Sequence, residues 1–511
     1  MIRLFFALVI VAVYFFALGS FPLVGPDEPR YAQIAREMFE RGDWLTPTLG
    51  GFNWFEKPVL LYWLQIVFYK LFGVSEFAAR FGSAIFGILT IFSLWILGRN
   101  SATENFEQEN KTLSENYVSS VAKTDFANWL ALIAASSAGL LVFSRGASFD
   151  IILTFPITAS LVGFFIFDQS KEKSGFTSHF SLLTFHFFIG VALLAKGLVG
   201  IVFPFAIVAF YYLLSRRFPN KTFIFSLFWG TLVSLLVASV WYLPMYQAHG
   251  WTFIDEFFIQ HQFQRYTTDK YQHSQPFYFF FWVLPLLTLP WLPFFLASIW
   301  NFLKGIFRHR DTGTQRRDFL LFSFSPLLLF SFSWLVVPLV FFSFSGSKLP
   351  GYILPALPAA LILTAEYVFR FVRKSEKRKI ALQISAFFAF AAFALLLQFY
   401  APKLAYEDSV KNLVESANAK GFGNEKITNL FTVSHNAEFY AAGRLLRDDA
   451  GKLKRYDDFL DLVNSLKREN TPKILVLVPH SNTKDITGSP LVESEILGDN
   501  GDTAIVLVKP K

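Results

Sequence analysis

Long apolar runs constrain this chain more than any other feature of its sequence. They cover approximately residues 2–20, 79–98, 126–143, 149–168, 179–195, 197–215, 222–243, 277–300, 319–343, 351–371 and 381–400. Hydrophobic residues make up 53% of the 511 residues, and the mean hydropathy is +0.42. Because a helix needs about 20 apolar residues to cross a bilayer, the sequence predicts a polytopic α-helical membrane protein with about eleven transmembrane helices.

The N-terminal run follows a basic residue, Arg3, and is long for the core of a signal peptide. We therefore expect an uncleaved first span, with a cleaved signal that ends near Ser20 as the alternative. The chain contains no cysteine, which excludes disulfides, iron–sulfur clusters, thiolate metal sites and cysteine nucleophiles.

Basic residues are concentrated in a few short loops. The chain has 46 Lys and Arg against 38 Asp and Glu, a net charge of +8. If the N-terminus lies inside, the inside loops include the Lys- and Arg-rich segments 168–175, 215–221, 301–318 and 370–379. This agrees with the positive-inside rule and accounts for the surplus charge without a nucleic-acid partner. The first inside loop, about 99–125, is mixed in charge.

The same orientation places every unusual polar cluster outside. These clusters are Asp27 with Glu28, Glu56 with Lys57, Arg145 with Asp150, Lys196, segment 251–277 and segment 345–352. A Glu-Lys pair is usually solvated, but Phe55 and Pro58 flank this one close to the lipid, which favours a desolvated, functional pair. Any chemistry is therefore expected on the outer face.

The first outer loop is predicted to contain amphipathic helices at the membrane surface. Asp27 is a candidate N-cap, and an apolar face then recurs at helical spacing. The members of this face are Tyr31, Ile34, Ala35, Met38 and Phe39. Arg30, Glu37 and Arg41 can face water or headgroups, and a second apolar surface segment follows Pro58. Asp27 either serves chemistry or only caps its helix.

The final segment, 401–511, has a different character, with mixed charges and short strand-like runs. Runs at 427–433, 473–479 and 503–509 alternate with a helical stretch at 456–470. We predict a small α/β domain outside the membrane, after a transmembrane domain of residues 1–400. His435 and Glu438 are either ligands or ordinary surface residues.

Ordered motifs between about residues 20 and 360 resemble a known family. The motifs are DEPRYAQIAREM at 27–38, GDW at 42–44, FEKP at 55–58, RFGS at 80–83, AKGLVGIVFP at 195–204, QFQRY at 262–266, SQPFYFFFWVLPLLTLPW at 274–291 and FFSFSGSKLPGYIL at 341–354. They resemble the bacterial lipid A aminoarabinose transferases and the wider protein mannosyltransferase-like group. These are integral membrane glycosyltransferases of the C-type fold that take sugar from a polyprenyl-phosphate carrier. The aminoarabinose members typically have two further spans after the region that ends here near 371, where this sequence shows one.

The resemblance implies roles for individual residues. Lys57, Arg265 and Tyr352 match positions that hold the carrier phosphate, and Asp27 matches the first-loop aspartate. Asp27, Lys57 and Asp150 are the candidate catalytic residues. The candidate substrate-binding residues are Glu28, Arg30, Tyr31, Glu56, Lys196, Arg265, Lys348 and Tyr352.

Transfer of a sugar from a polyprenyl phosphate requires cationic and acidic side chains of this kind. Fixed cations stabilise the phosphate that leaves as the glycosidic bond breaks, although each lysine alone could simply snorkel at a helix end. Asp27 could act as a general base towards a hydroxyl or orient an acceptor that is already ionised. Asp150 either orients the sugar or caps its helix.

Several functions remain open from the sequence. The first is inverting transfer of a polyprenyl-phosphate-linked sugar to lipid A or another outer-face lipid or glycan, in a bacterial cytoplasmic membrane with a periplasmic site. The second is transfer to a protein Ser or Thr, and the third is a transporter or flippase, which the one-sided polar clusters disfavour. No metal is required, although Glu56 and His261 could hold a divalent ion.

Overall fold

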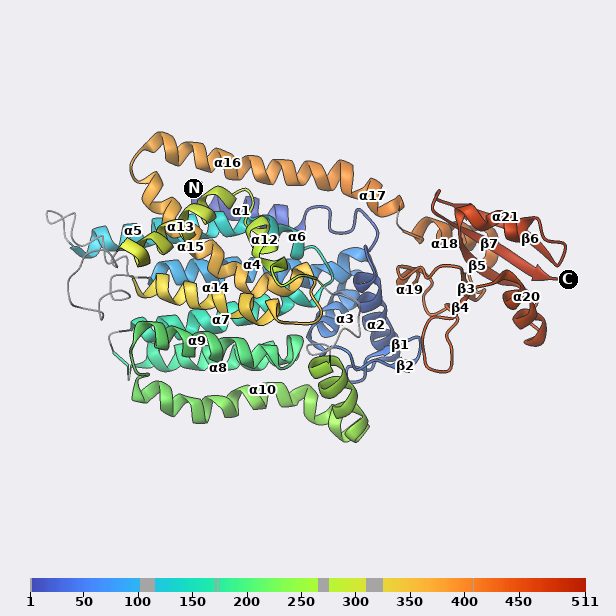
Figure 1. Ribbon diagram of the computed structural model, residues 1–511, viewed down its shortest axis with the longest axis horizontal. Helices are drawn as coiled ribbons and strands as arrows, with labels where there is room; N and C mark the ends of the chain where they lie inside the picture. Colours follow the sequence, from blue (N-terminus) through green and yellow to red (C-terminus); the bar gives the residue numbers. More distant parts are fainter. Residues whose placement is uncertain are drawn as a thin grey trace.

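The computed structural model describes residues 2–101, 115–170, 172–173, 175–264, 275–308, 325–407 and 409–511. A bundle of helices forms most of the molecule, and a β-sheet from the C-terminal part lies beyond one end of it (Figure 1). The bundle helices are α1 (Ile2–Phe15), α4 (Glu76–Asn100), α5 (Glu115–Ala135), α6 (Ala138–Phe143), α7 (Phe149–Gln169), α8 (Phe176–Lys196), α9 (Val199–Ser215), α10 (Lys221–Ile254), α12 (Phe279–Leu287), α13 (Leu292–Arg308), α14 (Pro326–Ser343), α15 (Leu357–Val372) and α16 (Glu376–Leu395).

In the part of the chain that the structure describes, each apolar run of the sequence contains a helix, so a multi-span membrane protein is confirmed. Within the described residues, seven helical segments are long and apolar enough to cross a bilayer: 76–100, 149–169, 176–196, 221–261, 326–343, 350–372 and 376–407. Shorter apolar helices cover 6–15, 60–72 and 199–215. The count of eleven spans stays a prediction.

Two of the predicted spans are broken, and the breaks pack against each other. Run 126–143 divides into α5 and α6 at Ser136 and Ser137, and run 277–300 divides into α12 and α13. The backbone N–H of Ala138 donates to the carbonyl of Leu289 (2.7 Å), and the indole N–H of Trp291 donates to Ser136 Oγ (2.9 Å). Each break thus gains a hydrogen-bond partner from the other, as helix breaks within a membrane protein require.

Small residues let the helices approach closely. A Cβ added at Gly163 on α7 would lie 2.8 Å from the carbonyl oxygen of Ser181 on α8. A Cβ at Gly230 on α10 would lie 2.1 Å from the ring of His186, which is completely buried on α8. Close backbone contact of this kind is the usual basis of helix association in membranes.

The segment predicted as the first outer loop forms a platform between the bundle and the C-terminal sheet (Figure 1). It contains α2 (Asp27–Arg41), the hairpin of β1 (Thr48–Leu49) and β2 (Phe52–Asn53), and α3 (Leu60–Phe72). The apolar face of α2 is buried as predicted, with Phe39 only half-buried.

Two sequence interpretations of α2 are wrong. Asp27 is the first helical residue rather than the N-cap, because Pro26 occupies the cap position and no side chain caps the helix. Glu37 does not simply face water, because its carboxylate accepts hydrogen bonds from the Thr48 hydroxyl and the Gly50 and Gly51 amides. Glu37 therefore fixes the hairpin onto α2.

The C-terminal part contains a five-stranded mixed sheet of order β4-β3-β5-β7-β6. Its strands are β3 (Ile427–Leu430), β4 (Arg455–Tyr456), β5 (Ile474–Pro479), β6 (Val492–Asp499) and β7 (Thr503–Pro510). Alternate residues of β5 enter two separate cores, one shared with α20 (Phe459–Arg468) and the other with α18 (Lys411–Ala417). The three predicted strands and the predicted helix are confirmed, whereas β4 and β6 carry little apolar signal and were missed. The predicted domain boundary after residue 400 falls within helical segment 376–407 and stays a prediction.

We predict that Gly230→Val destabilises the bundle. The added side chain would meet the His186 ring, and such overpacking costs about 1–3 kcal/mol. Thermal unfolding in detergent measures the effect, with Leu232→Val as the control because Leu232 is 58% exposed on the same helix. Equal melting temperatures for the two variants would contradict the packing described here.

Candidate active site

A chamber of about 290 Å³ lies where several segments distant in sequence meet. The loop after β2, the α8–α9 connection, the π-helical segment η2 (Asp255–Gln264) and the region from α14 to η3 (Pro350–Ala356) all contribute to its wall. Its polar lining consists of Glu56, Lys57, Lys196, His261, Ser345 and Tyr352. Its apolar lining includes Val199, Val202, Phe257, Phe341 and Phe342. The chamber thus combines charged groups with a wall suited to hydrocarbon.

Glu56 and Lys57 form an ion pair at the chamber wall. Lys57 Nζ lies 2.9 Å from Glu56 Oε1, and each side chain is only 10% exposed. The prediction that this pair is desolvated is confirmed. Water screens such a pair little, so both charges act strongly on any ligand in the chamber.

Asp150 does not line the chamber as described, but it pairs with Lys196, which does. The Lys196 ammonium forms an ion pair with the Asp150 carboxylate and lies 4.7 Å from the centre of the Tyr352 ring. The N-cap of α7 is Ser148, whose Oγ accepts a hydrogen bond from the Asp150 amide, so capping does not account for Asp150. A Cβ at Gly351 would lie 1.9 Å from Asp150 Oδ2, so this close approach requires glycine.

Lys348 lies just behind the chamber lining. Its ammonium donates to the carbonyl of Ser345 (2.6 Å), a lining residue, and it is only 7% exposed. A snorkelling lysine would place its ammonium in water, so the simple interpretation of Lys348 as a helix-end residue is wrong.

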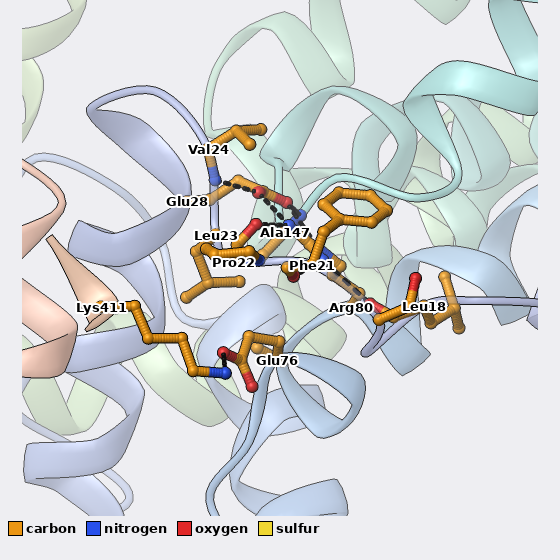
Figure 2. Close-up of polar contacts among 12 residues, drawn as sticks. Leu18, Phe21, Pro22, Leu23, Val24, Glu28, Glu76, Arg80, Ala147 and Lys411 are labelled. Carbon is orange, nitrogen blue, oxygen red and sulfur yellow. Dashed lines mark hydrogen bonds and ion pairs between the residues drawn. The ribbon is translucent and has the colours of Figure 1, made fainter. Parts of the chain in front are cut away.

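Glu28 is buried in an internal network (Figure 2), and it is not among the residues that line the chamber. It accepts two hydrogen bonds from Arg80, at 3.1 and 2.8 Å, and one each from the Val24 amide (2.8 Å) and the Ala147 amide (2.6 Å). Arg80 is completely buried and also donates to the carbonyls of Leu18, Phe21 and Pro22. These partners of Glu28 are all internal, so its predicted contact with substrate stays a prediction.

Asp27, Arg30 and Tyr31 lie beside this network on α2 and outside the lining of the chamber as described. Asp27 is 47% exposed and pairs with Arg30 at 3.4 Å. Arg30 lies 5.7 Å from the Trp54 ring, and Tyr31 is buried edge-on against Phe149 (4.9 Å). Burial and the carboxylates of Glu56 and Asp27 raise the pKa of the Tyr62 hydroxyl, while the Arg30 guanidinium opposes the shift. Arg265 lies outside the described residues.

Two arginines were missed or undervalued in the sequence. Arg80 is the second residue of the predicted span 79–98, and a charge within a predicted span is itself a signal of a paired position. Arg145, counted only among the outer clusters, donates to the carbonyls of Val13 and Phe16 at the end of α1. Both guanidinium groups bind backbone carbonyls, and this pairing cannot be read from sequence spacing.

The C-terminal segment places two titratable residues, His435 and Glu438, near charged residues of α2. Glu438 is not an ordinary surface residue, because it is 5% exposed and forms a buried ion pair with Arg447. Burial and the nearby Arg30 guanidinium lower the pKa of His435 below its usual value, while Asp27 opposes the shift. Among the described residues, no group of three or more His, Cys, Asp or Glu side chains is arranged to hold a metal ion.

The helical bundle and the terminal sheet define a class: multi-span membrane proteins with the C-type glycosyltransferase fold. ArnT from Cupriavidus metallidurans, solved with bound undecaprenyl phosphate, superposes with a TM-score of 0.75 at 22% identity over 99% of this chain and 97% of that one. The oligosaccharyltransferase AglB from Archaeoglobus fulgidus gives 0.54 at 14% identity over 94% and 69% of the two chains.

Sequence comparison indicates the particular relatives. The family described as dolichyl-phosphate-mannose-protein mannosyltransferase matches residues 1–105 and 119–254. An undecaprenyl phosphate-alpha-4-amino-4-deoxy-L-arabinose arabinosyl transferase of Shewanella sediminis (strain HAW-EB3) is 30% identical over 404 residues, which are 78% of this chain. The match spans 65% of that relative's length. The chain is therefore similar to this group of membrane glycosyltransferases, and the resemblance indicated by the motifs is confirmed.

We predict that Arg80→Ala strongly destabilises the protein. Removal of one partner from a buried ion pair leaves the other charge uncompensated, at a cost of about 3–5 kcal/mol. Unfolding in detergent measures the loss, and Arg36→Ala is the control because Arg36 pairs with Glu40 on the surface of α2 (2.7 Å). That exposed pair is worth at most about 1 kcal/mol. Similar losses for both variants would contradict the role assigned to Arg80.

Proposed function

We propose that the protein transfers a sugar from a polyprenyl-phosphate donor to lipid A or another lipid or glycan on the outer face of the membrane. The observation that carries this proposal is the convergence of Glu56, Lys57, Lys196 and Tyr352 on one partly apolar chamber. The names of the arabinosyl transferase relatives and of the ArnT structure with undecaprenyl phosphate support this donor class.

The charges of the chamber suit a carrier phosphate. Among the described residues in and behind its wall, the ammonium groups of Lys57, Lys196 and Lys348 outnumber the carboxylates of Glu56 and Asp150. The phosphate gains negative charge as its bond to the sugar breaks, so fixed cations in a dry site stabilise the transition state more than the ground state. The Tyr352 hydroxyl is a further neutral donor, and Arg265 belongs to the same proposed set.

The two aspartates are the proposed groups for positioning the sugar and the acceptor. Asp150, held by Lys196, would orient the sugar. Asp27 would act as a general base if the acceptor is a hydroxyl, or would orient an acceptor phosphate that is already ionised at neutral pH. In either case the acceptor attacks opposite the departing phosphate, which inverts the configuration of the anomeric carbon.

We further propose eleven spans, with the chamber and the C-terminal domain on the periplasmic side of a bacterial inner membrane. The α9–α10 and α15–α16 connections lie at the end of the bundle away from the C-terminal sheet (Figure 1). Both contain clusters of Lys and Arg, as cytoplasmic loops do. This arrangement supports an outward-facing site.

A protein Ser or Thr acceptor is the second candidate. The match to the mannosyltransferase family is the observation that favours it. The two functions are distinguished by their products. If the acceptor is a protein, label from the donor sugar would appear in extracted protein rather than in extracted lipid.

We predict that Asp27→Asn and Lys57→Ala each lower transfer at least about a hundredfold, the scale of losing one charge-stabilising group. Purified protein is incubated with a panel of synthetic polyprenyl-phosphate sugars and membrane lipid, and labelled product is counted. Lys57→Ala should also weaken binding of polyprenyl phosphate, whereas Asp27→Asn should not. Lys420→Ala is the control, because Lys420 makes an exposed ion pair with Glu495 in the C-terminal sheet region. Undiminished turnover by both site variants would refute the proposed site.

We propose that transfer needs no metal ion. Glu56 and His261 both line the chamber and could hold a divalent ion, but Glu56 is already paired with Lys57. We predict an unchanged transfer rate after dialysis against EDTA. A loss of activity that zinc restores in the wild type, but not in His261→Ala, would overturn this proposal.

A further inference from the structure

The chain that leads from α1 to α2 is held at its backbone by side chains from elsewhere. Arg80 on α4 donates to the carbonyls of Leu18, Phe21 and Pro22, at 2.9, 3.0 and 2.8 Å. Glu28 accepts from the Val24 amide (2.8 Å). A further contact is made by the C-terminal domain, because the Tyr440 hydroxyl accepts a hydrogen bond from the Leu23 amide (2.8 Å).

Tyr440 belongs to a polar junction between the C-terminal domain and α4. It ends the short helix α19 (Ala437–Tyr440), which contacts α2. Its hydroxyl donates to Glu76 Oε1 (3.2 Å), and the ammonium of Lys411 on α18 lies 2.7 Å from the same oxygen. Glu76 and Arg80 are separated by one helical turn, so α4 presents both groups on the same side (Figure 2).

The junction formed by Glu76, Lys411 and Tyr440 is largely buried. The side chains of Glu76 and Lys411 are 11% and 20% exposed. Burial and the Glu76 charge raise the pKa of Tyr440 far above its usual value, so the hydroxyl keeps its proton and donates to Glu76 while it accepts from Leu23. Leu23 is completely buried, so without Tyr440 its amide would lack this partner in a place that water reaches poorly.

We propose that Tyr440 is a positioning residue by which the C-terminal domain holds the start of α2, and with it Asp27, in place for transfer. The proposal rests on the proposed function of Asp27. On this basis the C-terminal domain is part of the catalytic unit, because the segment that precedes Asp27 is fixed on one side by Arg80 and Glu28 and on the other by Tyr440.

Tyr440→Phe tests the proposal, since it removes one hydroxyl and leaves the ring. Tyr456→Phe is the matched control: its hydroxyl also makes a buried hydrogen bond within the C-terminal domain, to Ser465 (3.0 Å), at a distance from the segment 18–28. Hydrogen–deuterium exchange of peptides covering residues 21–28 is measured in detergent for the wild type and both variants. The transfer rate and the KM for the polyprenyl-phosphate donor are measured on the same preparations.

We expect exchange at residues 21–28 to be about tenfold faster in Tyr440→Phe, because the buried Leu23 amide loses its hydrogen-bond partner. We also expect kcat to fall by a similar factor with an unchanged donor KM, and neither change in Tyr456→Phe. Glu76→Gln should produce a smaller change of the same kind, because it keeps an acceptor oxygen for Tyr440 but removes the charge that binds Lys411.

Unchanged exchange in Tyr440→Phe would overturn the proposed hold on the segment. Faster exchange with an unchanged kcat would overturn the positioning role, because loosening the segment would then have no effect on catalysis. A wild-type protein inactive with every donor would refute the proposed function instead, and the exchange measurement would still decide whether Tyr440 holds the segment.

Discussion

The buried ion pair of Glu28 and Arg80 is the interaction on which the end of the bundle nearest the C-terminal sheet depends. A charge beside the hydrocarbon core must be paired and fully hydrogen-bonded, and both groups meet this condition with partners from separate segments. Asp27 is adjacent to Glu28 in sequence, and Asp150 follows three residues after Ala147, whose amide donates to Glu28. One carboxylate thus fixes the backbone beside both candidate catalytic aspartates, although it lies outside the chamber lining as described.

The chamber follows the same rule of paired charges. Its cations are held in place before any donor arrives, Lys57 by Glu56 and Lys196 by Asp150. A bound phosphate would therefore find ammonium groups that need little reorganisation, which is the condition for strong electrostatic stabilisation in a dry site. The apolar side chains of α9 and α14 in the same wall would contact the hydrocarbon chain of a bound lipid carrier next to its charged end.

Sequence reasoning could predict what depends on local pattern. Apolar runs indicated the helices, short strand-like runs indicated β3, β5 and β7, and the motifs and outer-loop positions pointed to Glu56, Lys57, Lys196, His261 and Tyr352, all of which line the chamber. It could not predict the contacts made between remote segments. Three examples are the Ser136–Trp291 hydrogen bond at two helix breaks, the hydrogen bond from the Ala147 amide to Glu28 and the Tyr440–Leu23 hydrogen bond. Each joins residues that are far apart in sequence and come together only when the chain folds.

Photo-crosslinking with a polyprenyl phosphate that carries a diazirine beside the phosphate tests most directly whether the chamber binds a carrier headgroup. After irradiation in detergent, mass spectrometry should find the label within residues 54–60, 195–202 and 341–354, and free undecaprenyl phosphate should compete it away. Label spread over the exposed faces of α10 and α16, or label that the competitor does not reduce, would contradict a headgroup site in the chamber.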